Sequence, residues 1–422
     1  MPFDVIAILI TLTALFSFLN VRHFGLPSTI GVLAIALLFS VVVIIVGKLG
    51  IPSLRSVAAG FVGQIDFNEI LLHGLLAYLL FAGGLNLKIH QLSDQKFAIA
   101  LLSTLGVAIS TLLVGGGAWL VLNCVGLPIP PIAALLFGAL ISPTDPVAVL
   151  AILRTLAIPQ SLEAQIAGES LFNDGVGAVV FMVLLRIGTS SAHIGILEAS
   201  KLLAIEAAGG VGFGLIAGLM TYWLLARVDD YKVEILLTIG LASGGYALAD
   251  ALGVSAPIAI VVAGLLIGNE GRERAMSEET RSHLDVFWEV VDEILNALLF
   301  LLIGVELLLL PLHRGYAIAS LLAIPLTLGA RLVSVICVAL ILMPFRKIER
   351  GTIPVLTWSG LRGGISVALA LSVPNREYRD AIISMTYAVV IFSVIGQGLT
   401  LRSLILRTVP SVQSGGPKAS SL

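Results

Sequence analysis

The sequence has few charged residues for its length. Asp, Glu, Lys and Arg make up 12% of its 422 residues, whereas hydrophobic residues make up 58%. A soluble domain usually carries about twice that share of charge. Many apolar stretches run for about 20 residues, the length that crosses roughly 30 Å of hydrocarbon as a helix. We therefore predict a polytopic membrane protein, and the lack of alternating polar and apolar residues argues against a membrane β-barrel.

Cysteine is also scarce, and the two cysteines, Cys124 and Cys337, lie far apart in apolar stretches. We interpret them as packed side chains rather than as a disulfide or metal pair. No CxxC or HExxH motif is present, and we expect no cofactor. The formal net charge of −2 gives no indication of a nucleic-acid partner. The N-terminus lacks the features of a cleaved signal peptide, so we expect a retained span.

The apolar stretches predict an all-α fold with about 13 transmembrane helices. Their approximate limits are 4–20, 29–47, 69–87, 97–123, 131–156, 162–187, 199–226, 231–250, 255–269, 286–310, 316–343, 351–373 and 380–404. Residues 270–285 are expected to form a loop, and residues 408–422 a short disordered cytoplasmic tail. Lys and Arg concentrate in the loops that lie inside if the N-terminus is outside and the C-terminus inside.

The fifth and the twelfth predicted spans are both interrupted. The fifth contains Ser142-Pro143-Thr144-Asp145-Pro146, and the twelfth contains Ser359-Gly360-Leu361-Arg362-Gly363-Gly364. Broken helices at matching positions of two halves indicate a transporter built from two inverted repeats, with the binding site at mid-membrane. We therefore expect two six-helix repeats joined by a linker span.

Five charged residues fall inside these spans, and each costs roughly 2.5–3.5 kcal/mol to place in mid-membrane. They are Asp145, Glu169, Asp174, Arg331 and Arg362. Two bases cannot neutralise three acids, so we expect one carboxylate to remain free. The alternative, that the acids serve only in structural ion pairs, stays open at this point.

Helix geometry suggests which acid is free. In Gly168-Glu169-Ser170-Leu171-Phe172-Asn173-Asp174-Gly175, Ser170 and Asp174 lie about 40° apart on a helix, and Glu169 lies about 140° from Asp174. Asp174 can then face a cavity with Ser170 while Glu169 faces a neighbouring helix. A desolvated carboxylate holds either a proton or a small cation, and that competition is the minimum requirement for exchange.

The bases suggest partners for the other two acids. We expect Arg331 to pair with Glu169, and Arg362 to offset the negative ends of half-helices and to pair with Asp145. Four further acids, Glu289, Asp292, Glu293 and Glu306, lie in or near the tenth span. We interpret them as interfacial, or as a funnel that attracts cations.

Three motifs in this order resemble the monovalent cation:proton antiporter-1 family. They are Thr144-Asp145-Pro146, Glu169-Ser170-Leu171-Phe172-Asn173-Asp174 and Gly360-Leu361-Arg362-Gly363-Gly364. The similarity covers nearly the whole chain and is greatest to prokaryotic NhaP-type Na⁺/H⁺ antiporters.

The resemblance implies a homodimer in the inner (cytoplasmic) membrane that exchanges Na⁺ or Li⁺ for H⁺. It implies a dimerisation domain of about 1–90 and 199–310, and a mobile core of about 97–187 and 316–404. It also implies a Na⁺ site at Asp174, Ser170 and Thr144, with Asn173 holding the unwound Asp145 region. The Asn173-Asp174 pair implies electroneutral exchange, one cation for one proton.

One departure concerns Ala82, where some archaeal relatives carry a Glu. The sequence leaves open a K⁺(Na⁺)/H⁺ exchanger of the same fold and, from other classes, a cation channel. An intramembrane hydrolase would need a nucleophile–base pair, whereas the six His residues fall mostly in predicted loops or at span ends.

Overall fold

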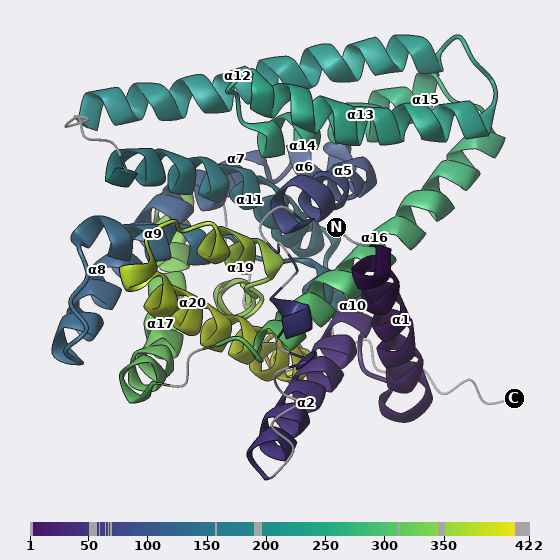
Figure 1. The fold of residues 1–422 in the computed structure, drawn as a ribbon. Coiled ribbons are helices and arrows are strands. Elements are labelled where there is room, and N and C mark those ends of the chain that lie inside the picture. Colours follow the sequence, from purple (N-terminus) through teal and green to yellow (C-terminus); the bar gives the residue numbers. More distant parts are fainter. Residues whose placement is uncertain are drawn as a thin grey trace, which may run out of the picture.

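The computed structural model describes residues 3–49, 57–58, 60–63, 65, 67, 70–156, 158–189, 196–310, 313–344 and 351–409. These residues form helices joined by short turns (Figure 1). The helices of the first half are α1 (Phe3–Leu19), α2 (Ser28–Lys48), α5 (Leu76–Asn86), α6 (Ile89–Ser93), α7 (Lys96–Leu101), α8 (Val107–Cys124), α9 (Pro131–Ile141), α10 (Val147–Leu153) and α11 (Gln160–Thr189).

The second half continues with α12 (Ile196–Leu225), α13 (Tyr231–Ala251), α14 (Ala256–Leu266), α15 (Arg272–Arg274), α16 (Glu278–Glu306), α17 (Arg314–Leu342), α18 (Thr352–Trp358), α19 (Gly364–Leu371), α20 (Arg376–Ile391) and α21 (Gly398–Thr408). Short π-helical segments extend or join several of them: Asn20–Phe24, Ile70–Leu75, Leu102–Gly106, Ile267–Gly271 and Phe392–Gln397.

The prediction of an all-helical polytopic membrane protein is confirmed. Within the described residues, eight helical segments are long and apolar enough to cross a membrane. Each predicted span coincides with one helix or with two or three consecutive helical segments. The fifth span is broken into α9 and α10 and the twelfth into α18 and α19, as predicted from their Pro and Gly residues.

The predicted loop over 270–285 is wrong over most of its length, because helical structure continues through α15 to Arg274 and α16 begins at Glu278. The Ser277 hydroxyl accepts a hydrogen bond from the Thr280 N–H at 3.3 Å, and Glu278 and Glu279 occupy the first turn. A serine cap and early acidic residues start a helix even in a polar stretch. Of the predicted tail, residues 410–422 lie outside the described residues, and Thr408 belongs to α21.

The helices pack in two groups. In one group α14 packs against α5, α12 and α13, and α16 packs against α2 (Figure 1). In the other, α8 packs against α9 and α17, and α17 against α20. Between the groups, α11 contacts both α9 and α14. This arrangement places the broken helices beside α11, where the candidate site lies.

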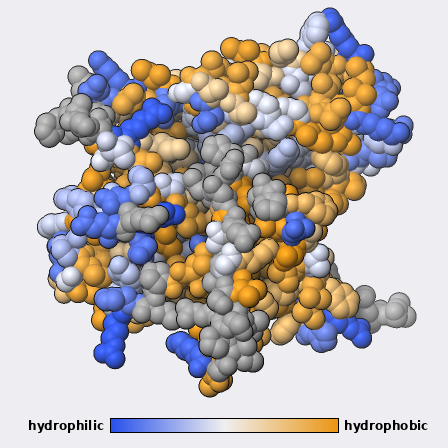
Figure 2. Space-filling view, in the orientation of Figure 1, coloured by the Kyte–Doolittle hydropathy of each residue, from blue (hydrophilic) through white to orange (hydrophobic). Residues whose placement is uncertain are grey.

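The surface has the distribution that a lipid environment requires. Large hydrophobic side chains are exposed along the long helices, for example Ile216, Leu236 and Leu321. On the face shown in Figure 2, hydrophilic residues gather mainly at the margins and hydrophobic ones cover much of the area between. Both cysteines are free; Cys337 is half-buried, but Cys124 is exposed rather than packed as predicted.

Candidate functional site

The two interruptions meet in space and are joined through their backbones. The Asp145 N–H donates to the carbonyl oxygen of Leu361 at 2.8 Å. Pro143 and Pro146 prevent a continuous helix through the first interruption, which leaves that N–H free to pair. Unwound backbone at this depth is tolerated only where protein or a water-filled cavity surrounds it. Both conditions hold here, since these residues are largely buried and the Asp145 region borders a cavity.

Each half-helix that ends at the crossing presents its carbonyl end to an arginine. Arg362 donates from Nη1 to the carbonyl oxygens of Ser142 and Pro143, both at 2.9 Å, at the end of α9. Arg331 donates from Nε and Nη2 to the carbonyl oxygen of Leu356, at 3.2 and 2.9 Å, near the end of α18. A cation at a helix C-terminus offsets the negative end of the helix dipole. The predicted role of Arg362 at a half-helix end is thus present.

The predicted ion pair between Arg362 and Asp145 is not formed between these two described side chains. The guanidinium of Arg362 is occupied by the carbonyl groups at the end of α9. The carboxylate of Asp145 instead accepts a hydrogen bond from the Val147 N–H at 2.9 Å, at the start of α10. Counting charges could not reveal this, because Asp145 and Arg362 bind backbone groups that become free to pair only where the helices are interrupted.

Gly363 allows Asp145 to take this position. A Cβ atom on Gly363 would lie 2.0 Å from the Asp145 Oδ2 atom, which is far below any contact distance. The backbone of Gly363 is extended, with φ −123°. The glycine is therefore required by close approach of the carboxylate and not by its own conformation.

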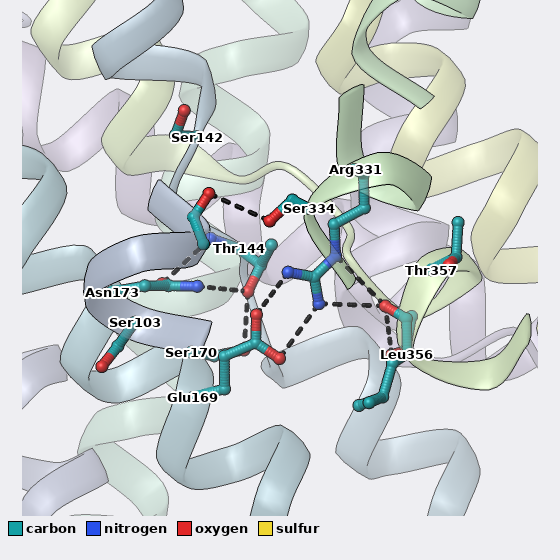
Figure 3. A network of polar contacts seen from close by, with 12 residues as sticks. Ser103, Ser142, Thr144, Glu169, Ser170, Asn173, Arg331, Ser334, Leu356 and Thr357 are labelled. Atoms are coloured by element: carbon teal, nitrogen blue, oxygen red, sulfur yellow. Dashed lines mark hydrogen bonds and ion pairs between the residues drawn. The ribbon is translucent and has the colours of Figure 1, made fainter. Parts of the chain in front are cut away.

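A hydrogen-bond network ties the first interruption to α11 (Figure 3). Asn173 accepts from the Thr144 N–H at 3.1 Å and donates to the Thr144 hydroxyl at 2.8 Å. The same hydroxyl lies 2.9 Å from the Ser170 hydroxyl. All three side chains are buried, so the amide of Asn173 compensates polar groups that the unwound backbone leaves unpaired.

Glu169 and Arg331 form the ion pair that the sequence predicted (Figure 3). Nη1 of Arg331 contacts Glu169 Oε1, and Nη2 donates to Oε2 at 3.0 Å. Both side chains are buried. The bidentate geometry leaves Glu169 with satisfied oxygen atoms and joins α11 to α17.

Asp174 differs from the other acids. It is 8% exposed and accepts no hydrogen bond from the described residues. It lines a cavity of about 500 Å³ together with Thr144 and Asp145. The cavity extends to Lys88, Arg154 and other exposed residues, so it opens to the solvent on that side of the membrane.

Two contacts at the site were not predicted: the Ser393 hydroxyl accepts from the Arg362 N–H at 2.7 Å, and Asn296 on α16 lines the cavity. No local motif marks Ser393. The acids of the tenth span were interpreted as interfacial or as a funnel, and two of them, Asp292 and Glu293, line the cavity. Ala82 is fully buried and does not line the cavity, and the side chain of His73 lies outside the described residues.

Comparisons with known proteins agree with this geometry. A family profile described as "Sodium/hydrogen exchanger, transmembrane" matches residues 8–407. The chain is 47% identical over 408 residues to the Na(+)/H(+) antiporter NhaP of Pseudomonas aeruginosa, covering 96% of each chain. It is 34% identical to the Na(+)/H(+) antiporter NhaH of Halobacillus aidingensis, over 90% of this chain and 95% of that one.

A solved structure shares the fold. The sodium proton antiporter MjNhaP1 from Methanocaldococcus jannaschii at pH 8 matches with a TM-score of 0.72, covering 93% of this chain and 97% of that chain. At 20% identity this similarity concerns the fold alone. Together with the profile and the relatives, it leads to one conclusion: the chain belongs to the sodium/hydrogen exchanger family of membrane transporters.

Proposed function

We propose that this protein exchanges Na⁺ or Li⁺ for H⁺ across the cytoplasmic membrane of a bacterium and so contributes to pH homeostasis. The observation that carries the proposal is Asp174, a buried carboxylate that lines a solvent-accessible cavity and has no hydrogen-bond donor within the part of the chain that the structure describes. Asp145, Glu169 and both arginines have partners, so Asp174 is the acid left to bind a transported ion. The relatives named above are Na⁺/H⁺ antiporters, which supports the choice of Na⁺.

Asp174 binds either one cation or one proton. A carboxylate in a poorly solvated site is costly while charged, so it remains occupied by one or the other. The hydroxyl of Thr144, which lines the cavity, and that of Ser170, 2.9 Å from it, supply oxygen atoms suited to Na⁺. The core moves only when Asp174 is neutralised, which couples Na⁺ movement to H⁺ movement at a ratio of one to one.

The moving part is the core of about 97–187 and 316–404, and the dimerisation domain of about 1–90 and 199–310 stays fixed in a homodimer. This division follows the two packing groups, with α11 at their boundary. The N-terminus lies outside and the C-terminus inside, according to the distribution of Lys and Arg. The cavity then opens to the cytoplasm, because it contains Lys88 and Arg154.

The test is purified protein in liposomes with an imposed pH gradient, to which Na⁺, Li⁺ or K⁺ is added with and without valinomycin. We expect Na⁺ to collapse the gradient equally in both conditions, and we expect Asp174→Asn to abolish this while the protein still folds. The apparent KM for Na⁺ should rise as the pH falls, because protons compete for the same carboxylate.

Other results would point to the rival functions. A response to K⁺ alone would make the protein a K⁺/H⁺ exchanger of the same fold. Flux that does not saturate and is not coupled to the pH gradient would indicate a cation channel. Normal exchange by Asp174→Asn would refute the site assignment.

A further inference from the structure

The cavity has a second acidic wall that comes from the other packing group. Asp292 on α16 lines the same cavity as Asp174 and Asp145, which come from α11 and the α9–α10 interruption. At about 500 Å³ the cavity has room for a cation that keeps part of its water. An ion that enters the cavity on its way to Asp174 therefore shares this space with Asp292.

Asn296 holds the Asp292 carboxylate in place. Its Nδ2 donates to the Asp292 carbonyl oxygen at 2.9 Å and to Asp292 Oδ1 at 3.1 Å. The two residues are four apart, so they lie on one face of α16. Both line the cavity, and no described residue donates a hydrogen bond to the side-chain amide oxygen of Asn296, Oδ1. The face thus offers carboxylate and amide oxygens, the ligand types that hard cations prefer.

Leu299 follows Asn296 on the same helix and places an apolar side chain on the cavity wall. Its methyl groups occupy the space beside Gly364, where an added Cβ would lie 2.3 Å from Cδ1. An ion bound at Asn296 therefore meets an apolar side chain further along α16, whereas Asp145 and Asp174 line the same cavity. This distribution favours transfer from α16 to the acids of the other packing group.

No ion pair within 4 Å neutralises Asp292 in the described part of the chain; those formed there join Arg186 to Glu206, Arg272 to Asp285, Arg274 to Glu270 and Arg331 to Glu169. Arg154 also lines the cavity and is close enough to attract Asp292 electrostatically, while Glu293 and Asp145 repel it. Asp174, more than nine-tenths buried and without a hydrogen-bond donor among the described residues, lines the same space. Two carboxylates without ion-pair partners in one cavity create a negative potential that a cation relieves.

We propose that Asp292 and Asn296 form a second binding station for a monovalent cation, which captures Na⁺ from the cavity and passes it to Asp174. The station belongs to the dimerisation domain, which stays fixed, so it does not move with the core when the core carries the ion across. It also supplies a carboxylate from outside the core. The inference rests on the proposed exchange function.

The test compares Asp292→Asn with Glu289→Gln in proteoliposomes. Glu289 is exposed on the same helix, about one turn away, and does not line the cavity, so its variant removes the same charge without touching the station. We expect Asp292→Asn to raise the KM for Na⁺ about fivefold to tenfold with kcat within twofold. We expect Glu289→Gln to change neither, and Asp292→Glu to restore a low KM. The difference in KM between Asp292→Asn and the wild type should shrink when choline chloride raises the ionic strength, because salt screens the attraction between Na⁺ and the Asp292 carboxylate.

A second measurement separates this inference from the exchange function. Na⁺-dependent thermal stabilisation of purified protein reports binding without transport, and Asp292→Asn should need several-fold more Na⁺ than the wild type for the same shift. If the wild type binds Na⁺ but does not exchange it, the exchange function fails and this titration still decides the station. If Asp292→Asn leaves both the KM for Na⁺ and the Na⁺ titration unchanged, the proposed second binding station is refuted. It is also refuted if Glu289→Gln raises the KM as much as Asp292→Asn does. If Asp292→Asn does not fold, Asn296→Ala, which frees the carboxylate, must raise the KM in the same direction or the proposal fails.

Discussion

Arg331 on α17 binds both carboxylate oxygens of Glu169 on α11 and, with the same guanidinium group, the carbonyl oxygen of Leu356 at the end of α18. One side chain therefore neutralises a buried acid and a half-helix end. Removing either partner leaves the other charge buried and unpaired, so Glu169→Ala and Arg331→Ala should each lower the free energy of unfolding by about 3–5 kcal/mol. Thermal melting in detergent measures the loss.

The matched control for that pair is Glu377→Gln, which removes an exposed carboxylate on α20. Its melting temperature should not change, because surface charges contribute little to stability. Equal melting of Glu169→Ala and the wild type would show that the pair does not hold α11 against α17.

The contacts of Arg362 predict unequal effects for the two residues that the sequence paired. Arg362→Ala leaves the carbonyl groups of Ser142 and Pro143 buried without donors, at a cost of about 1–3 kcal/mol each. Asp145→Asn keeps an oxygen that can accept from the Val147 N–H, and it leaves the contacts of Arg362 intact. We therefore expect Arg362→Ala to lower the melting temperature more than Asp145→Asn. The reverse order, or a double variant no worse than Arg362→Ala, would favour a direct ion pair.

The close approach of Gly363 to Asp145 makes a third prediction. Gly363→Ala places a methyl group where the Asp145 carboxylate lies, so the carboxylate and the backbone of the interruption must move. Because displacements of about 1 Å at a reacting site can cost up to about a hundredfold in rate, Na⁺-dependent exchange should fall roughly tenfold or more. Gly240→Ala in α13, where an added Cβ meets nothing within 4 Å, is the control and should retain full exchange. Normal exchange by Gly363→Ala would show that Asp145 need not occupy this position.

The composition and the motifs determined the class of protein and most of its helices. Apolar stretches of this length predict membrane spans. The spans are helices because lipid offers no hydrogen-bond partners for unpaired backbone groups. Pro143, Pro146 and the glycines of the second interruption marked both breaks, since their effect on the backbone is local. The excess of interior acids over interior bases indicated an available carboxylate, and helix periodicity pointed to Asp174 rather than Glu169.

Only the tertiary structure decided which groups meet. The ion pair of Glu169 with Arg331 was predicted, but that of Arg362 with Asp145 was not formed, because backbone carbonyl and N–H groups at the half-helix ends bind these side chains instead. Such partners have no signature in the sequence, as every residue carries the same backbone groups. The placement of Asp292 in the same cavity as Asp174 likewise depends on how α16 packs beside the broken helices, and helix packing brings together residues that lie over a hundred positions apart in the chain.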